Sequence, residues 1–252
     1  MAEIEHPAQI DCVLIAAGSY HDIDFARLEI MKLLAEDSNI RVRVFEDYEQ
    51  LDAIQKADCL ITYTSDVMPS QGAQEVLRDW LIAGGRWYAL HGTNSILQLR
   101  EDRLWDAPRC APLFMDLVGS QFVSHPPIAP YPVTVVKPEH PLVAGVGNFE
   151  TDDELYHLEL HGPLEVLMET ECTVESPGFV EGKDAPGKHP ICYIKSHGEG
   201  AVLYLSIGHA RGHHDMKPLI DWWRTEDRGA WKYPEFYELL RRGIRWLKRE
   251  IV

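Results

Sequence analysis

The sequence predicts an α/β protein built on a doubly wound parallel sheet. Strand-like and helix-like segments alternate through the first hundred residues. The segments 10–18 and 58–66 are continuous apolar runs, as expected of strands that are buried on both faces. Alternation of this kind places helices on right-handed crossovers between parallel strands, and ligands then bind beyond the carboxyl ends of the strands.

The elements of the first half follow in a regular order. After the first strand, Asp22 or Asp24 can cap a helix that extends to about residue 37. Residues 40–47 alternate apolar and charged side chains, which indicates a strand near a sheet edge. The 58–66 strand leads into a helix over 68–85, which has a proline in its first turn and ends at two glycines.

A fourth strand, 86–90, runs directly into His91 and Gly92. A sharp turn from a strand into a helix lifts one side chain above the sheet edge, where nucleophiles and general bases are often placed. A histidine that only caps the following helix is the structural alternative.

The second half is richer in proline and glycine. Residues 105–190 are expected to form a loop-rich insertion, with short strands such as 131–136 and 164–171, inside a single domain over 1–252, because no flexible linker marks a boundary. Residues 189–209 have the pattern of a hairpin that turns near Gly198 and ends at His209. The segment 233–251 is expected to be an amphipathic helix.

The composition excludes several classes of function. The net charge of −16 disfavours nucleic acid as a partner, because an acidic surface repels phosphates. No apolar run is long enough to span a membrane, and the first residues lack the features of a signal peptide, so we expect a cytoplasmic protein. The five cysteines are odd in number and contain no C-x-x-C pair, which argues against a disulfide framework and a zinc knuckle.

Five motifs, in the same order along the chain, resemble the ThuA-like, or trehalose-utilisation, family. They are GSYHD after the first strand, LHG at the turn, GSQFVSHPP, HPLVAGVGNFETDDELY and GEGAVLYLSIGHARGHH. The resemblance implies a flavodoxin-like fold related to the class I glutamine amidotransferases. Those relatives carry a catalytic cysteine where this chain has His91, and an imidazole is a far poorer acyl carrier than a thiolate. Glutamine hydrolysis is therefore not expected.

The resemblance and the strand ends together give the candidate site residues. His91 and His209 are the expected general acid–base pair, because an imidazole exchanges protons near neutral pH. Glu154 is expected to orient one imidazole, although the TDDELY segment also fits a solvated acidic turn. The residues expected to contact substrate are His21, His125, Tyr156 and Trp105; His125 precedes a proline, which keeps its backbone extended.

A divalent metal is an alternative reading of the same histidines. His91, His125 and His209 could gather from separate loops and hold zinc with one position open for substrate. The favoured function is an enzyme of carbohydrate catabolism that acts on a sugar or keto-sugar, with a trehalose-type disaccharide implied by the resemblance. The alternatives are a non-catalytic sugar-binding or regulatory protein and a metal-dependent hydrolase. A homodimer is compatible with an acidic domain of this fold, although no stretch indicates an interface.

Overall fold

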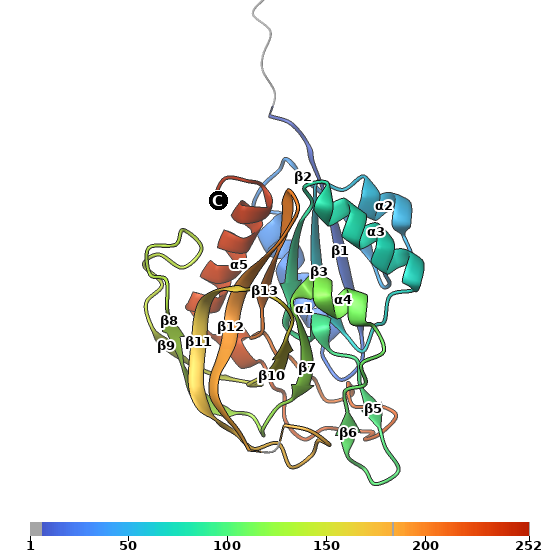
Figure 1. Ribbon diagram of the computed structural model, residues 1–252, viewed down its shortest axis with the longest axis vertical. Helices are drawn as coiled ribbons and strands as arrows, with labels where there is room; N and C mark the ends of the chain where they lie inside the picture. Colours follow the sequence, from blue (N-terminus) through green and yellow to red (C-terminus); the bar gives the residue numbers. More distant parts are fainter. Residues whose placement is uncertain (1–6, 183, 252) are drawn as a thin grey trace, which may run out of the picture.

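The computed structural model describes residues 7–182 and 184–251, which form an α/β fold around a nine-stranded sheet (Figure 1). The sheet order is β2-β1-β3-β4-β13-β12-β11-β8-β9. The first five strands in this order pair in parallel; the strand–helix alternation predicts this for β2, β1, β3 and β4, and β13 from the second half of the chain joins them. Their bounds are Ile40–Phe45 for β2, Ile10–Gly18 for β1, Cys59–Ser65 for β3, Arg86–Leu90 for β4 and Gly200–Leu205 for β13.

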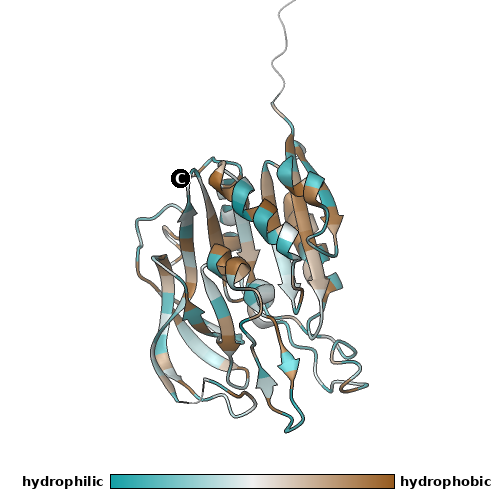
Figure 2. Cartoon of the chain, turned by 45° about the vertical axis from the view of Figure 1, so that its right-hand side comes forward, coloured by the Kyte–Doolittle hydropathy of each residue, from teal (hydrophilic) through white to brown (hydrophobic). Residues whose placement is uncertain are grey.

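Helices cover both faces of the sheet. Helices α1 (Ile23–Leu34) and α5 (Pro234–Leu247) share one hydrophobic cluster with the strands, whereas α2 (Leu51–Gln55), α3 (Gln71–Ile82) and α4 (Pro112–Val118) pack in a second cluster on the opposite face. In Figure 2, much of the central strands is brown, the colour of hydrophobic residues. The sequence did not reveal α2, which is only five residues long.

The expected boundaries of the long elements are close to those observed. The Asp22 side chain accepts a hydrogen bond of 3.1 Å from the backbone N–H of Phe25 and caps α1. Strand β2 pairs with β1 alone at the sheet edge, which explains its alternating pattern. The predicted hairpin is confirmed as β12 (Ala185–His197) paired antiparallel with β13.

The segment 105–190 is more regular than a loop-rich insertion. It supplies β8 (Ala129–Val135), β9 (Phe149–Asp153), β11 (Glu165–Val174) and part of β12, which extend the parallel half as antiparallel strands. The same segment contains β7 (Ser120–Ser124) paired with β10 (His157–Leu160). Its first strand, β6 (Trp105–Asp106), forms a small hairpin with β5 (Gln98–Leu99).

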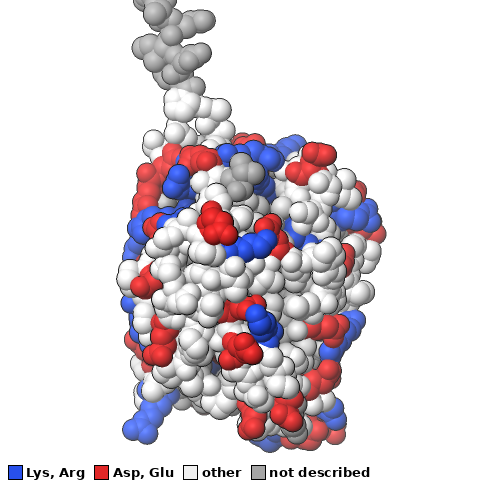
Figure 3. Space-filling model, turned by 60° about the vertical axis from the view of Figure 1, so that its left-hand side comes forward, with Lys and Arg blue, Asp and Glu red and all other residues white. Residues whose placement is uncertain are grey.

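The surface has mixed charge. On the face shown in Figure 3, acidic and basic side chains are interspersed, with no continuous basic patch. Among the described residues, no helix is long and apolar enough to cross a membrane.

Candidate functional site: a buried histidine–glutamate cluster

The turn after β4 places His91 at the carboxyl edge of the sheet. His91 has a φ of +45°, the left-handed region that few non-glycine residues adopt, and it begins the 3₁₀ helix η1 (His91–Asn94). Gly92 lies so close to β3 that an added Cβ would be 2.7 Å from the Thr64 carbonyl oxygen. The sharp strand-to-helix turn is therefore present, although a 3₁₀ helix follows it, and the strain at His91 is typical of functional positions.

Four side chains from distant parts of the chain converge at this edge. They are His21 after β1, His91 after β4, Glu154 after β9 and His209 after β13, and one potential ligand atom from each lies within 4.8 Å of all the others. All four are buried, with exposed fractions of 7% or less. The carboxyl ends of parallel strands meet at one edge of a sheet, which is why residues so far apart in sequence can gather here.

The hydrogen bonds of two imidazoles fix where their lone pairs point. The Nδ1–H of His91 donates to the Ser206 carbonyl at 2.7 Å, and the Nδ1–H of His21 donates to the Ser19 carbonyl at 3.2 Å. A neutral ring that carries its proton on Nδ1 has its lone pair on Nε2. The two Nε2 atoms are only 2.9 Å apart, so both lone pairs point into the same small space and repel unless a proton or another cation lies between them.

Glu154 supplies the negative charge of the cluster. Its carboxylate oxygens lie 3.5 Å from His91 Nε2 and 3.2 Å from His209 Nδ1, and the Arg211 guanidinium donates to it at 3.1 Å. Burial by itself raises the pKa of the Glu154 carboxyl, but the neighbouring His125 and His209 outweigh burial and hold this pKa well below its ordinary value. Glu154 is therefore ionised.

His209 is the least satisfied member of the cluster. Neither of its ring nitrogens makes a hydrogen bond within the described residues, and its side chain is fully buried. Burial lowers the pKa of His209 well below its ordinary value, against the opposing effect of Glu154. Apart from the contact of Nδ1 with Glu154 at 3.2 Å, this buried ring has no polar partner, and a bound cation would offset the cost of its desolvation.

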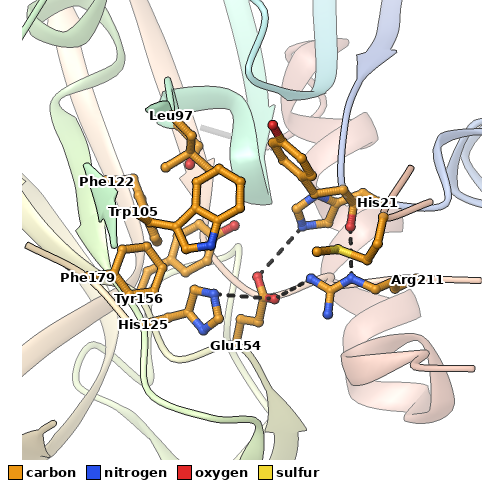
Figure 4. Close-up of a pocket in the computed structure, with 12 residues that line it drawn as sticks. His21, Leu97, Trp105, Phe122, His125, Glu154, Tyr156, Phe179 and Arg211 are labelled. Carbon is orange, nitrogen blue, oxygen red and sulfur yellow. Dashed lines mark hydrogen bonds and ion pairs between the residues drawn. The ribbon is translucent and has the colours of Figure 1, made fainter. Parts of the chain in front are cut away.

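A pocket opens directly above the cluster (Figure 4). Its enclosed cavity is small, about 60 Å³, and it opens to solvent at a wider mouth. Polar groups at its base are Glu154, His21, His125 and Arg211, and aromatic rings form much of the remaining wall. The aromatic residues that line it are Tyr20, Trp105, Phe122, Tyr156 and Phe179.

The structure brings all seven predicted site residues to this pocket and cluster. His91 and His209 lie beneath the pocket rather than in its lining, whereas His21, Glu154, His125, Tyr156 and Trp105 line it. The Tyr156 hydroxyl lies 2.9 Å from His91 Nε2, and burial raises the pKa of Tyr156 well above its ordinary value, so the hydroxyl is the donor.

Two of the three metal ligands expected from the sequence, His91 and His209, belong to the observed cluster, which His21 and Glu154 complete in place of His125. His125 belonged to that set, but it lies at the pocket wall, with a partly exposed side chain and its Nε2 3.6 Å from Glu154. Its Nδ1–H donates to the Pro126 carbonyl at 2.7 Å. His21 occupies the fourth place in the cluster, because β1 lies beside β3 in the sheet and its carboxyl end faces that of β4 across one strand.

Sequence reasoning missed Arg211 and the role of Asp153. Strand β9 ends at Asp153, and Asp153 is buried rather than part of a solvated acidic turn. Asp152 does remain partly exposed and pairs with Lys232. The basic residue between the histidines of HARGHH was the one available signal for Arg211.

Comparison with known proteins agrees with the motifs. The family model for ThuA, trehalose utilisation, matches residues 13–220. The chain belongs to the ThuA family. No curated protein matches it significantly.

Solved structures of ThuA-like proteins share the fold. One from Parabacteroides merdae ATCC 43184 is 15% identical, with a TM-score of 0.69 over 97% of this chain and 91% of that one. One from Bacteroides uniformis ATCC 8492 is 16% identical, with a TM-score of 0.65 over 98% and 95% of the two chains. A cytoplasmic protein from Salmonella typhimurium LT2 is 12% identical, with a TM-score of 0.52 over 96% and 100%. At these identities the similarity shows the fold alone.

Proposed function

We propose that this ThuA family protein is a carbohydrate-active enzyme whose buried cluster holds a divalent metal ion beneath a pocket for one sugar ring. The observation that carries the proposal is the pair of Nε2 lone pairs, from His21 and His91, that face each other at 2.9 Å beside an ionised carboxylate. Burial lowers the pKa of His21, which disfavours a proton on the Nε2 of that ring. A metal ion between the two nitrogens would relieve their repulsion and would replace the hydrogen bond that the Tyr156 hydroxyl donates to His91 Nε2.

The donor set fits a transition metal better than calcium or magnesium. Three imidazoles and one carboxylate suit zinc and its divalent neighbours, whereas calcium and magnesium prefer oxygen ligands. His21 and His91 each donate their second ring N–H to a backbone carbonyl, which is the usual way that ligating histidines are oriented. When bound, such an ion acts as a Lewis acid on a carbonyl or hydroxyl oxygen of the ligand.

This proposal changes the roles expected for two histidines. His91 and His209 were expected to exchange protons with substrate, but both lie below the pocket lining, out of direct contact with a ligand in it. We assign them to metal binding and assign proton transfer to His125, whose partly exposed imidazole faces the pocket. An imidazole in that place can remove a proton beside a sugar carbonyl. Tyr156 and Arg211 provide hydrogen-bond donors to ligand oxygens.

The shape of the pocket supports a sugar as the ligand. An aromatic wall faces a polar base, which matches a sugar ring with its C–H face on one side and its oxygens on the other. The enclosed part of the pocket is only about 60 Å³, so a sugar is expected to bind at its mouth, with the side chains of the wall moving apart to admit one ring. The family name supports a trehalose-type disaccharide or its keto form as the substrate. The Salmonella neighbour described as cytoplasmic supports the same compartment here.

Metal analysis combined with a sugar panel tests the proposal. The purified protein is expected to contain close to one transition-metal ion per chain and to convert at least one disaccharide or keto-disaccharide, with products identified by mass spectrometry. A chelator is expected to abolish turnover, and His91→Ala to remove the metal. A protein that binds no metal and turns over its sugar equally well with a chelator would overturn the metal proposal. Saturable sugar binding without any product would instead favour a binding or regulatory protein.

A further inference from the structure

Asp153 is a buried carboxylate that is held by backbone amides. Its side chain is 1% exposed, and no Lys or Arg of the described residues forms an ion pair with it. It accepts hydrogen bonds from the backbone N–H groups of Glu154 at 2.8 Å, Gly208 at 3.0 Å, His209 at 3.2 Å and Ala230 at 2.6 Å. A carboxylate that is buried this deeply is costly unless such donors compensate it.

These four donors join three parts of the chain at one point. Glu154 follows β9, Gly208 and His209 follow β13, and Ala230 belongs to the 3₁₀ helix η2 (Gly229–Lys232). The neighbouring backbone is shaped around the carboxylate, because a Cβ added to Gly229 would lie 2.4 Å from Asp153 Oδ2. A single side chain therefore fixes the backbone of Glu154 and His209, which come from different strands.

We propose that Asp153 is a positioning residue of the cluster and sets the distance between Glu154 and His209. The proposal rests on the proposed metal centre. The reason is that the only side-chain partner of the His209 ring is Glu154, 3.2 Å from Nδ1, and Asp153 anchors the backbone of both residues. The other two cluster histidines are oriented by carbonyls instead.

An asparagine in this place would keep the size of the side chain but not its acceptors. Oδ1 accepts from Glu154 and His209, and Oδ2 accepts from Gly208, His209 and Ala230. Whichever way the amide is turned, its NH₂ group faces backbone N–H donors and repels them. The backbone of one or the other ligand must therefore move.

The test is zinc affinity, measured by competition with a chromophoric chelator at a temperature where circular dichroism shows each variant to be folded. Asp153→Asn is expected to raise the Kd for Zn²⁺ about 10- to 100-fold, the range seen when the support of a metal ligand is removed. It is also expected to change the visible spectrum of bound Co²⁺. The matched control is Asp152→Asn, one residue away, whose partly exposed carboxylate interacts with Lys232 and Tyr233 and not with the cluster; its Kd is expected to stay within twofold of the wild type.

The outcomes separate three cases. If Asp153→Asn lowers the melting temperature but leaves the Kd and the Co²⁺ spectrum unchanged, Asp153 only stabilises the fold and the inference is wrong. If the wild type binds no metal, the proposed function itself fails. If Asp153→Asn does not fold, Tyr63→Phe decides, because the Tyr63 hydroxyl donates to the Gly208 carbonyl at 2.8 Å and steadies the same loop. An increase in Kd of threefold or more then supports the inference, and an unchanged Kd overturns it.

Discussion

Replacing Glu154 by glutamine removes the negative charge of the cluster while keeping the shape of the side chain. The Glu154 carboxylate is 2% exposed and accepts from Arg211 at 3.1 Å. Its pKa lies well below the ordinary value, in spite of the opposing effect of burial, so the fold stabilises the charged form. The Glu154→Gln variant therefore loses a favourable interaction and leaves the Arg211 guanidinium without its partner.

The size of the effect follows from this geometry. Breaking a buried ion pair by removing one partner costs about 3–5 kcal/mol. The lower end applies here, because the Arg211 Nε–H still donates to the Tyr20 carbonyl at 3.0 Å and the Arg211 side chain is 11% exposed. A loss of about 3 kcal/mol is a large share of the roughly 5–15 kcal/mol by which proteins are stable.

Urea denaturation of the metal-free protein at pH 7, with a chelator present, measures this loss. Glu154→Gln is expected to lower the free energy of unfolding by about 3 kcal/mol with an unchanged m-value. The control is Glu159→Gln, whose 43% exposed carboxylate pairs with Arg109 and is expected to contribute about 0–1 kcal/mol. A loss below 1 kcal/mol for Glu154→Gln would refute the reasoning, because it would mean that the metal-free cluster does not depend on the charge of Glu154.

Three further predictions concern the pocket and the pH dependence of stability. Trp105→Ala is expected to weaken sugar binding roughly two- to tenfold in a titration, since an aromatic contact contributes about 0.5–1.5 kcal/mol. Trp222→Ala, outside the pocket lining, is expected to leave binding unchanged. Tyr156→Phe is expected to weaken sugar binding without lowering zinc affinity in the chelator assay. Zinc affinity is kept because the Tyr156 hydroxyl, which the variant lacks, competes with the metal for His91 Nε2. A clear loss of zinc affinity would contradict this reasoning. Burial lowers the pKa of His197 in the folded protein. As the pH falls through about 6.5, the unfolded state therefore takes up a proton on this ring before the folded state does. The free energy of unfolding decreases with pH until the pH passes below the pKa of the folded state. His197→Gln is expected to show a smaller decrease between pH 8 and pH 5, and an equal decrease in both proteins would rule out this source.

The order of the elements in the parallel half could be predicted from local patterns. Apolar runs such as 10–18 match β1 residue for residue, and the caps of α1 and α3 are local interactions that the sequence displays. In the segment 105–190 the expected strands 131–136 and 164–171 correspond to β8 and β11, whereas β9 and the joining of these strands to the main sheet were not predicted, because they depend on pairing between strands that are separated in the sequence. Long-range pairing of this kind leaves little trace in a window of ten residues.

Candidate site residues could be found where they follow a strand, and this rule located His21, His91 and His209. It could not separate ligands from the residues around them. Asp153 and Glu154 are adjacent acidic residues in one motif, yet Asp153 binds backbone amides and Glu154 faces the imidazoles. That difference depends on where β9 ends, at Asp153, and on the loops that meet there.

By itself, the sequence determined which chemical groups stand at the ends of the strands, because strand ends are marked by local changes from apolar to polar residues. Only the tertiary structure decided which of them share one small space. His21 rather than His125 joins the buried cluster, and Arg211 neutralises its carboxylate, since these contacts depend on strand order and loop path over separations of 57 to 70 residues. The physical reason is that lone pairs converge only when their atoms lie within a few ångströms of one another in the packed fold. The spacing of the residues along the chain does not determine those distances.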